Sequence, residues 1–185
     1  MELMEAIRGR RAVRAFLPRP VANNVLGKLI DAAIQAPSAV NSQPWHFTVI
    51  RNAALLDSIS AASKAHMLAT IKEDAAPHGF REYLSDPNFH IFYHAPVLVL
   101  ISASSGDWAV EDATLAAENL MLAAHAEGLG TCWIGFAQRW LGTEEGRRMI
   151  DVPPGTMPVA PIIVGYLKEP APPVPRKPAT IHWLD

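Results

Sequence analysis

The chain has 185 residues and a mass of 20.1 kDa, so residues 1–185 are expected to form a single domain with its own hydrophobic core. A hydrophobic fraction of 50%, a charged fraction of 18% and a net charge of −2 exclude a disordered chain and a globally basic nucleic-acid-binding protein. Cys132 is the only cysteine, which excludes a disulfide framework and a cysteine-rich zinc module. The N-terminus lacks the apolar run of a signal peptide, and no apolar stretch approaches the ~20 residues of a membrane span. We therefore expect a cytoplasmic protein with no membrane partner.

Hydrophobic periodicity and turn residues predict helices alternating with strands. In chain order the expected elements are a helix over Glu2–Arg8, a helix over Val21–Ala36, a strand over His46–Arg51, a mostly helical stretch over Ala53–Leu84 broken at Pro77–Gly79, a strand over Val97–Ser102, a helix over Asp107–Glu127, a strand over Thr131–Phe136, a helix over Thr143–Ile150 and a strand over Val159–Tyr166.

The long helix and the C-terminal arm both suggest contact with a second chain. The helix over Asp107–Glu127 is apolar around most of its circumference, so it should be either central in the domain or shared with another subunit. The stretch Pro170–Pro178 holds five of the sixteen prolines and should be extended, and Thr180–Leu184 could then form an edge strand. An extended arm with an apolar end is better explained by contact with a partner subunit than by a tail that is free in solvent.

Positive charge is concentrated at the two ends of the chain. Residues 6–30 contain five arginines and Lys28 but no acidic residue, and the acid-free residues 170–184 contain Arg176 and Lys177. Clustered guanidinium groups repel one another unless an anion lies between them, and arginine suits bidentate phosphate contacts. The pattern indicates either a site for a phosphorylated ligand or a solvated basic face. Nucleic acid is disfavoured because no aromatic residues alternate with the arginines as a stacking surface.

A polar loop, Pro37–Trp45, precedes the first expected strand. Its Asn and Gln amides each present a donor and an acceptor, which complements the edge of a heterocycle, and its prolines would stiffen the loop. An ordinary turn followed by a core tryptophan remains the alternative.

Segments along almost the whole chain resemble motifs of the nitroreductase family of FMN-dependent oxidoreductases, in the same order. They are RRAVRAF at Arg10–Phe16, APSAVNSQPW at Ala36–Trp45, HAPV at His94–Val97, EGLGTCWIG at Glu127–Gly135, and the C-terminal VGY at Val164–Tyr166 with PRKP at Pro175–Pro178. The resemblance implies an α+β fold in which a mixed sheet is flanked by helices. It also implies a homodimer with FMN at the interface and the arm of residues 170–185 exchanged onto the partner.

The resemblance assigns roles to residues at both ends of the chain. Arg10 and Arg176, together with Lys177, would hold the FMN phosphate. Arg11 and Ala12 would contact FMN through their backbone. Ala12 stands where the family usually has serine, so a hydroxyl contact is lost there.

Other residues would surround the flavin ring. Arg14 would lie near its pyrimidine edge, where a cation raises the reduction potential. Residues of the polar loop would line the ring from the other subunit, and backbone groups after the Cys132 strand would lie near its reactive face. These two groups are Pro37, Ser38, Ala39, Asn41 and Gln43, and then Trp133, Ile134 and Gly135.

Other patterns in the sequence indicate little further chemistry. Gly128 and Gly130 follow a helix, which fits a cap and a tight turn but not a dinucleotide fingerprint. Cys132 within a strand is expected to be a small buried residue and not a nucleophile. His90 and His94 could share a helix face, but no third ligand is apparent, so no metal site is predicted.

We therefore expect an enzyme that accepts hydride from NADH or NADPH on bound FMN and reduces a nitroaromatic, quinone or related conjugated acceptor by a ping-pong mechanism. No protein side chain is assigned as catalytic, because the flavin N5 carries the hydride. The alternatives are a flavoenzyme of the same fold that carries out dehalogenation, dehydrogenation or flavin cleavage, and a non-enzymatic flavin-binding protein. A third class, an anion-binding or nucleic-acid-binding module without flavin, would be colourless, and its affinity for DNA would fall steeply with salt.

Overall fold

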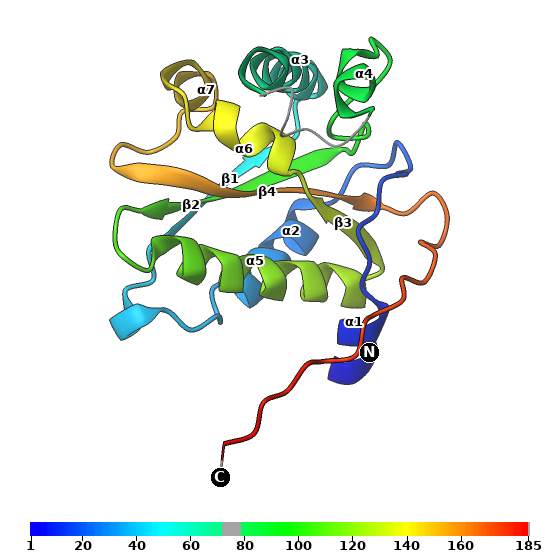
Figure 1. Cartoon of the computed structure of the whole chain (residues 1–185), viewed down its shortest axis with the longest axis vertical. Coiled ribbons are helices and arrows are strands. Elements are labelled where there is room, and N and C mark those ends of the chain that lie inside the picture. The colour runs from blue at the N-terminus through cyan, green and yellow to red at the C-terminus, as the bar shows by residue number, and fades with distance from the viewer. Residues whose placement is uncertain (72–78, 185) are drawn as a thin grey trace.

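A four-stranded sheet lies between two layers of helices in the computed structural model, which describes residues 1–71 and 79–184 (Figure 1). The strands are β1 (Trp45–Ile50), β2 (Val97–Ser104), β3 (Leu129–Trp133) and β4 (Thr156–Tyr166), in the spatial order β1-β2-β4-β3. Every neighbouring pair is antiparallel. The expected α+β fold is confirmed, whereas the expected mixed sheet is wrong for these strands. Among the described residues, parallel pairing occurs at an isolated bridge between Ala12 and Thr131.

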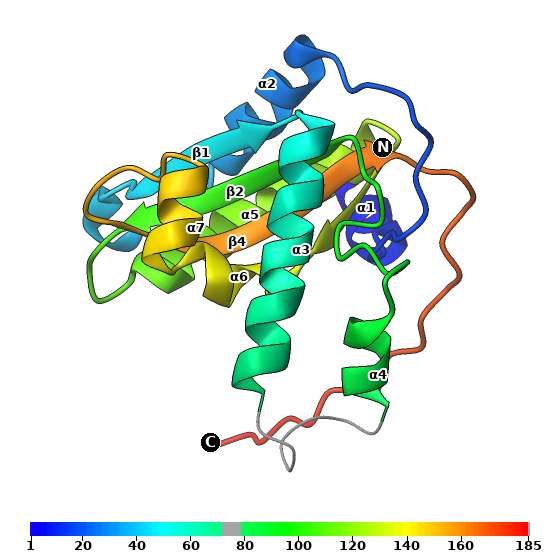
Figure 2. The same cartoon turned by 90° about the horizontal axis from the view of Figure 1, so that it is seen from above.

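Helices cover both faces of the sheet (Figures 1 and 2). On one face lie α2 (Asn23–Ala33) and α5 (Ala109–Ala126), with α1 (Leu3–Gly9) against the end of α5. On the other face lie α3 (Ala53–Thr70), α4 (Phe80–Ser85), α6 (Gly135–Leu141) and α7 (Glu144–Met149). Among the helices of the described ranges, none is long and apolar enough to cross a membrane.

The central strands divide the core into two layers. Along β2, Val97, Val99 and Ile101 pack into the cluster under α2 and α5, whereas Leu98 and Leu100 pack into the cluster under α3 and α6. A strand buried on both faces reads as a continuous apolar run, which is why the sequence predicts it well.

The strand expected over Thr131–Phe136 is partly wrong. The strand β3 ends at Trp133, and the short helix α6 begins at Gly135. The apolar run therefore belongs half to a strand and half to a helix, and periodicity cannot separate the two in so short a stretch.

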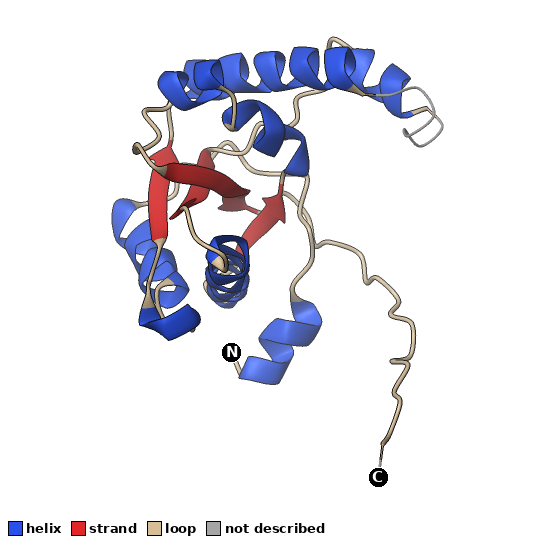
Figure 3. Ribbon diagram, turned by 60° about the vertical axis from the view of Figure 1, so that its left-hand side comes forward, coloured by secondary structure: helices blue, strands red, loops and turns tan. Residues whose placement is uncertain are grey.

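Two other expectations also need correction. His90 and His94 lie on turns, so they do not share a helix face. Residues 180–184 form no strand, and the C-terminal tail runs as an extended segment away from the body of the molecule (Figure 3). Within the expected break at Pro77–Gly79, Pro77 and His78 lie outside the described residues, and Gly79 immediately precedes α4.

Candidate functional site

The basic segment Arg10–Arg14 is fastened to the edge of the sheet by backbone hydrogen bonds. Val13 N donates to Thr131 O at 2.9 Å, and further along Leu17 N donates to Tyr166 O at 2.9 Å. Gly130 makes this approach possible, because a Cβ atom at that position would lie 2.7 Å from the Val13 side chain. The absence of a side chain in β3 therefore sets how closely the arginines lie to the sheet.

The guanidinium groups of this segment are incompletely paired. Arg10 Nε lies 3.4 Å from Glu118 Oε1, which is an ion-pair distance without hydrogen-bond geometry. Arg11 Nη1 donates to the carbonyl oxygens of Arg8 at 2.6 Å and of Arg10 at 2.8 Å. The Nε atoms of Arg10 and Arg11 are both buried and have no hydrogen-bond partner among the described residues. Buried donors of this kind are normally satisfied, so they point to a ligand or a partner at this place.

Next to this segment is a cleft of about 690 Å³. Arg14 lines it on one side, and its guanidinium carbon lies 5.9 Å from the centre of the Tyr93 ring. The remaining walls come from the end of α3, the start of α4, the turn before β2 and the region where β3 leads into α6. These residues are Met67, Thr70, Ile71, Phe80, Tyr93, Cys132, Trp133, Ile134, Gly135, Phe136 and Arg139. No acidic residue is among these described wall residues, so the cleft suits an aromatic or anionic ligand.

Two titratable side chains of the cleft stay neutral near pH 7. Burial, followed by the hydrogen bond with Tyr83, raises the pKa of Tyr93 to about 12. Burial is also the main cause that raises the pKa of the Cys132 thiol above its usual value, although Arg14 and Arg10 act in the opposite direction. The Cys132 side chain is 4% exposed, as expected for a buried small residue, so it is a poor nucleophile here.

The β3–α6 connection contributes backbone as well as side chains to the cleft. Ile134 N donates to Pro161 O at 2.8 Å, so this N–H group is already engaged. Gly135 is exposed and begins α6. Trp133, Ile134 and Gly135 do lie together with Arg14 around one cleft, which is the grouping that the sequence predicted for them.

The polar loop Pro37–Trp45 is held in a different way, by a buried carboxylate. Asp112, in the first turn of α5 and 4% exposed, accepts from Ala39 N at 3.0 Å and from Ser42 Oγ at 3.3 Å. The loop backbone is strained, since Val40, Asn41 and Gln43 all have positive φ angles of 47°, 55° and 47°. Val40 is 100% exposed. Strain retained in an exposed loop is typical of a binding site.

The structure therefore divides the predicted site residues into separate groups. Arg10, Arg11, Ala12 and Arg14 lie by the cleft end of the sheet, whereas the loop is bound to the first turn of α5, toward the opposite end of that helix from α1 (Figure 1). Arg176 and Lys177 are exposed on the extended tail. Within one chain the start of the tail, including Pro170 and Pro172, lines a pocket with Arg11 and Arg14, whereas the loop lies apart from the arginines.

Sequence reasoning missed two acidic residues that organise these groups. Glu118 lies beside Arg10, and Asp112 fixes the loop. An acidic residue on a long helix is commonly explained by the helix dipole or by contact with solvent, so neither stands out in the sequence. The buried position of Asp112 becomes apparent only when the loop, 70 residues away along the chain, is placed against α5.

Comparisons with known proteins identify relatives of this chain. A model of the Nitroreductase family matches residues 7–166. A Methanothermobacter thermautotrophicus protein with the provisional name NADH dehydrogenase/NAD(P)H nitroreductase is 32% identical over 175 residues, which cover 91% of this chain and 79% of that protein. The 4-nitrobenzoate reductase of Pseudomonas putida is 31% identical over 164 residues, covering 71% of this chain and 72% of the relative.

Solved structures show the same fold. The crystal structure of a nitroreductase with bound FMN from Bacteroides fragilis is 28% identical, covers 100% of both chains and gives a TM-score of 0.84. The fold and the sequence together define an oxidoreductase of the nitroreductase type. The chain belongs to the nitroreductase family.

Proposed function

We propose that this protein binds FMN, accepts hydride from NADH or NADPH, and reduces a nitroaromatic, quinone or related conjugated acceptor in a ping-pong sequence. The observation that carries the proposal is the cleft of about 690 Å³ beside Arg14, close along the chain to buried arginine Nε donors that have no hydrogen-bond partner in the part of the chain that the structure describes. The 32% and 31% identical relatives named for nitroreductase activity, and the FMN of the Bacteroides fragilis structure, support it.

The residues present fit a phosphorylated flavin. The unpartnered Nε atoms of Arg10 and Arg11 are donors of the kind that a phosphate satisfies, and Arg176 and Lys177 would add to them from the tail. The cleft is largely aromatic and apolar, as a flat ring system requires, with Arg14 as the cation at its edge.

A homodimer would complete the site. The loop residues Pro37, Ser38, Ala39, Asn41 and Gln43 would approach the ring of the other chain, because within one chain they lie toward the opposite end of α5 from α1. Exposed apolar side chains supply a surface for such pairing, including Leu115 on α5, Leu3 and Ile7 on α1, and Ile181 and Trp183 on the tail. Exchange of the 170–185 arm onto the partner would cover the last two.

Bound flavin supplies the group that accepts and returns hydride. Arg14 would stabilise negative charge at the pyrimidine edge of the ring, and it lines the cleft without an acidic neighbour among the described wall residues. The aromatic wall, where the ring centres of Phe80 and Phe136 are 5.3 Å apart, would exclude water and hold a flat acceptor parallel to the flavin ring. Tyr93 would remain a neutral hydroxyl donor throughout.

The visible spectrum of the freshly purified protein tests this proposal. The protein should be yellow, and anaerobic NADH or NADPH should bleach it at a rate that matches turnover. A nitroaromatic or quinone should then restore the colour. A colourless protein would contradict flavin binding, and a yellow protein that neither nicotinamide bleaches would indicate a flavin-binding protein that is not a reductase.

A further inference from the structure

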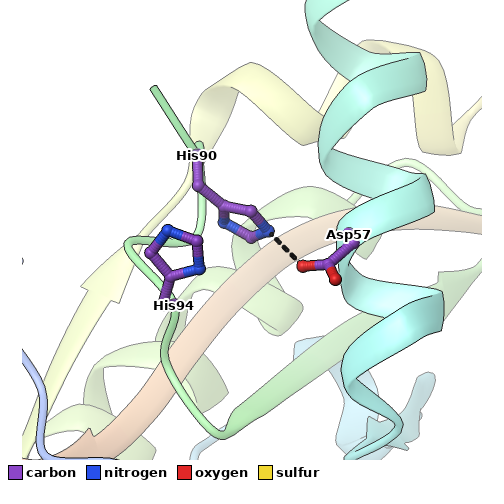
Figure 4. A group of neighbouring side chains, drawn as sticks. All are labelled: Asp57, His90 and His94. Carbon is purple, nitrogen blue, oxygen red and sulfur yellow. Dashed lines mark hydrogen bonds and ion pairs between the residues drawn. The ribbon is translucent and has the colours of Figure 1, made fainter. Parts of the chain in front are cut away.

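A second group of reactive side chains lies outside the proposed flavin cleft, between α3 and the turn that leads into β2. Asp57 on α3 and His90 and His94 on the turn direct their polar atoms toward one another (Figure 4). One ligand atom from each of the three residues lies within 4.8 Å of the other two. His90 Nε2 lies 3.1 Å from Asp57 Oδ1, and the two imidazole rings are 4.4 Å apart between centres.

The turn is rigidly attached to α3. Lys64 Nζ donates to Asp86 O at 2.6 Å and to Phe89 O at 2.7 Å, and Ile91 N donates to Ser60 Oγ at 3.1 Å. His94 has a φ angle of 53°, a left-handed conformation that is unfavourable for histidine and is maintained by this attachment. The three side chains are therefore presented on a prepared scaffold and not on a loose loop.

A cavity of about 540 Å³ opens beside the group. Asp57, His90 and His94 all line it, and none of its lining residues belongs to the proposed flavin cleft. Two cations face this region, but each is already engaged: Arg51 Nη1 donates to Asn23 Oδ1, and Lys64 donates to backbone carbonyls. Water or a small ligand can therefore reach the group from the cavity.

We propose that Asp57, His90 and His94 bind a divalent transition-metal ion, with Zn²⁺ as the ion that this donor set fits best. Two imidazoles and one carboxylate suit zinc and its neighbours, whereas Mg²⁺ and Ca²⁺ prefer oxygen ligands alone. Tetrahedral zinc needs donor atoms roughly 3.3 Å apart. The exposed side chains of Asp57 and His94 can close that distance by rotation, and the cavity provides room for a fourth ligand.

The proton on His90 determines how the ion enters. In the metal-free protein His90 Nδ1 accepts a hydrogen bond from Phe92 N at 3.2 Å. The ring proton is therefore on Nε2, which donates a hydrogen bond to Asp57 Oδ1. A metal bound at Nε2 takes the place of that proton, which moves to Nδ1 as the Phe92 contact is given up. The ring stays neutral, so no net proton is released.

Such an ion would join α3 to the turn before β2. Met67 and Thr70 on α3 and Tyr93 on the turn line the proposed flavin cleft. The metal would therefore have a structural role that fixes two walls of that cleft relative to each other. This inference does not depend on flavin binding, and it is tested by metal binding alone.

The direct experiment is zinc binding to chelator-treated protein, measured by competition with a chromophoric chelator and by metal analysis after gel filtration. The wild-type chain should retain one zinc ion. Asp57→Asn and His94→Asn should each weaken binding at least ~10-fold. The matched controls His46→Asn and Asp31→Asn change exposed residues outside this group and should bind as tightly as wild type. Equal binding by the His94→Asn and His46→Asn variants, or no zinc retained by the wild type, would overturn the proposal.

Two further measurements separate a built site from surface adsorption. Co²⁺ should give the intense visible d–d absorption of a tetrahedral nitrogen and oxygen site in the wild type but not in Asp57→Asn. Zinc at about 100-fold above its Kd should raise the Tm of the wild type by roughly 5–10 °C. The rise should be absent in His94→Asn, which is expected to fold because its side chain is exposed. An equal rise in both proteins would contradict the assignment.

Discussion

The basic segment Arg10–Arg14 and the polar loop Pro37–Trp45 are both part of the proposed flavin site, yet the fold holds them by different means. The segment is attached to β3 by backbone hydrogen bonds and by a close approach that requires Gly130. The loop is attached to α5 by a buried side chain, Asp112, and its backbone stays strained. The first attachment uses backbone hydrogen bonds that extend the sheet, whereas the second depends on one side chain.

This difference indicates what the basic segment and the polar loop would each gain from the proposed dimer. A segment incorporated in the sheet has its geometry before any partner arrives, so its arginines can be ready for a phosphate. The loop satisfies its own polar groups through Asp112 and through contacts among Ser38, Asn41 and Gln43, yet it leaves the Val40 side chain fully exposed. The proposed dimer pairs a rigid half-site of one chain with an outward-facing half-site of the other.

The largest expected effect comes from breaking the attachment of the basic segment. Gly130→Ala would place a Cβ atom 2.7 Å from Val13, which must move and carry Arg11 and Arg14 with it. We expect unfolding to become easier by about 1–3 kcal/mol and FMN retention to fall. Denaturant unfolding and flavin content after dialysis measure the two effects. Gly106→Ala is the control, since a Cβ there meets nothing within 4 Å, and equal behaviour of the two variants would contradict the packing argument.

Next in size is the removal of a phosphate-binding charge. Arg10→Ala should weaken FMN binding about 10–100-fold, because a hydrogen bond to a charged group is worth about 1.5–3 kcal/mol. Arg176→Ala should act in the same direction if the arm reaches the site of the partner. Flavin titration of the apoprotein measures both, with Arg148→Ala on α7 as the control. The phosphate assignment is wrong if both variants remain fully loaded after dialysis.

A smaller effect is expected at the loop. Asp112→Asn keeps one acceptor but loses the charge, so the contacts to Ala39 and Ser42 should weaken by about 1 kcal/mol. If the loop serves the site of a partner, FMN retention should also fall. Glu111→Gln, at the neighbouring exposed position, is the control for a general change of charge in the first turn of α5. Unchanged retention in Asp112→Asn would separate the loop from the flavin site.

The smallest effect is a change of pKa beneath the basic segment. Burial, followed by the charges of Arg10 and Arg11, holds the pKa of His125 below 6.5. Because the unfolded chain then binds the proton more readily, this group lowers stability as pH falls from 6.5 through the folded pKa. A phosphate between the arginines should raise the His125 pKa, as NMR titration with and without FMN or inorganic phosphate would show. An unchanged pKa with bound FMN would argue that the phosphate lies elsewhere.

Much of the fold could be predicted because buried strands leave simple patterns. The apolar runs at β2 and β4 and the long helix α5 were predicted within a few residues of their observed bounds. The helix α6 was missed because its apolar residues continue those of β3 without a break. The mixed sheet was implied by the family resemblance and is wrong for the four strands of the described residues, which pair antiparallel. Local patterns could not correct it, because strand direction depends on how the connections cross in space.

The grouping of site residues was partly predictable as well. Arg14 and the stretch Trp133–Gly135 do meet at one cleft. The contact of Asp112 with the loop could not be inferred, since an acid in the first turn of a helix is commonly explained by the helix dipole. The placement of Asp57 beside His90 was also missed, because these residues are 33 positions apart and the signal for a third ligand exists only in the folded chain.

The location of Asp112 and Arg10 on opposite halves of the proposed site has a consequence for mixed oligomers. When Arg10→Ala and Asp112→Asn subunits are combined, each heterodimer has one site that carries both changes and one site that carries neither. Random exchange of subunits should then restore about a quarter of all sites, although neither parent protein has an intact one. Complementation between two defective proteins would thus follow from a single buried carboxylate at the start of α5.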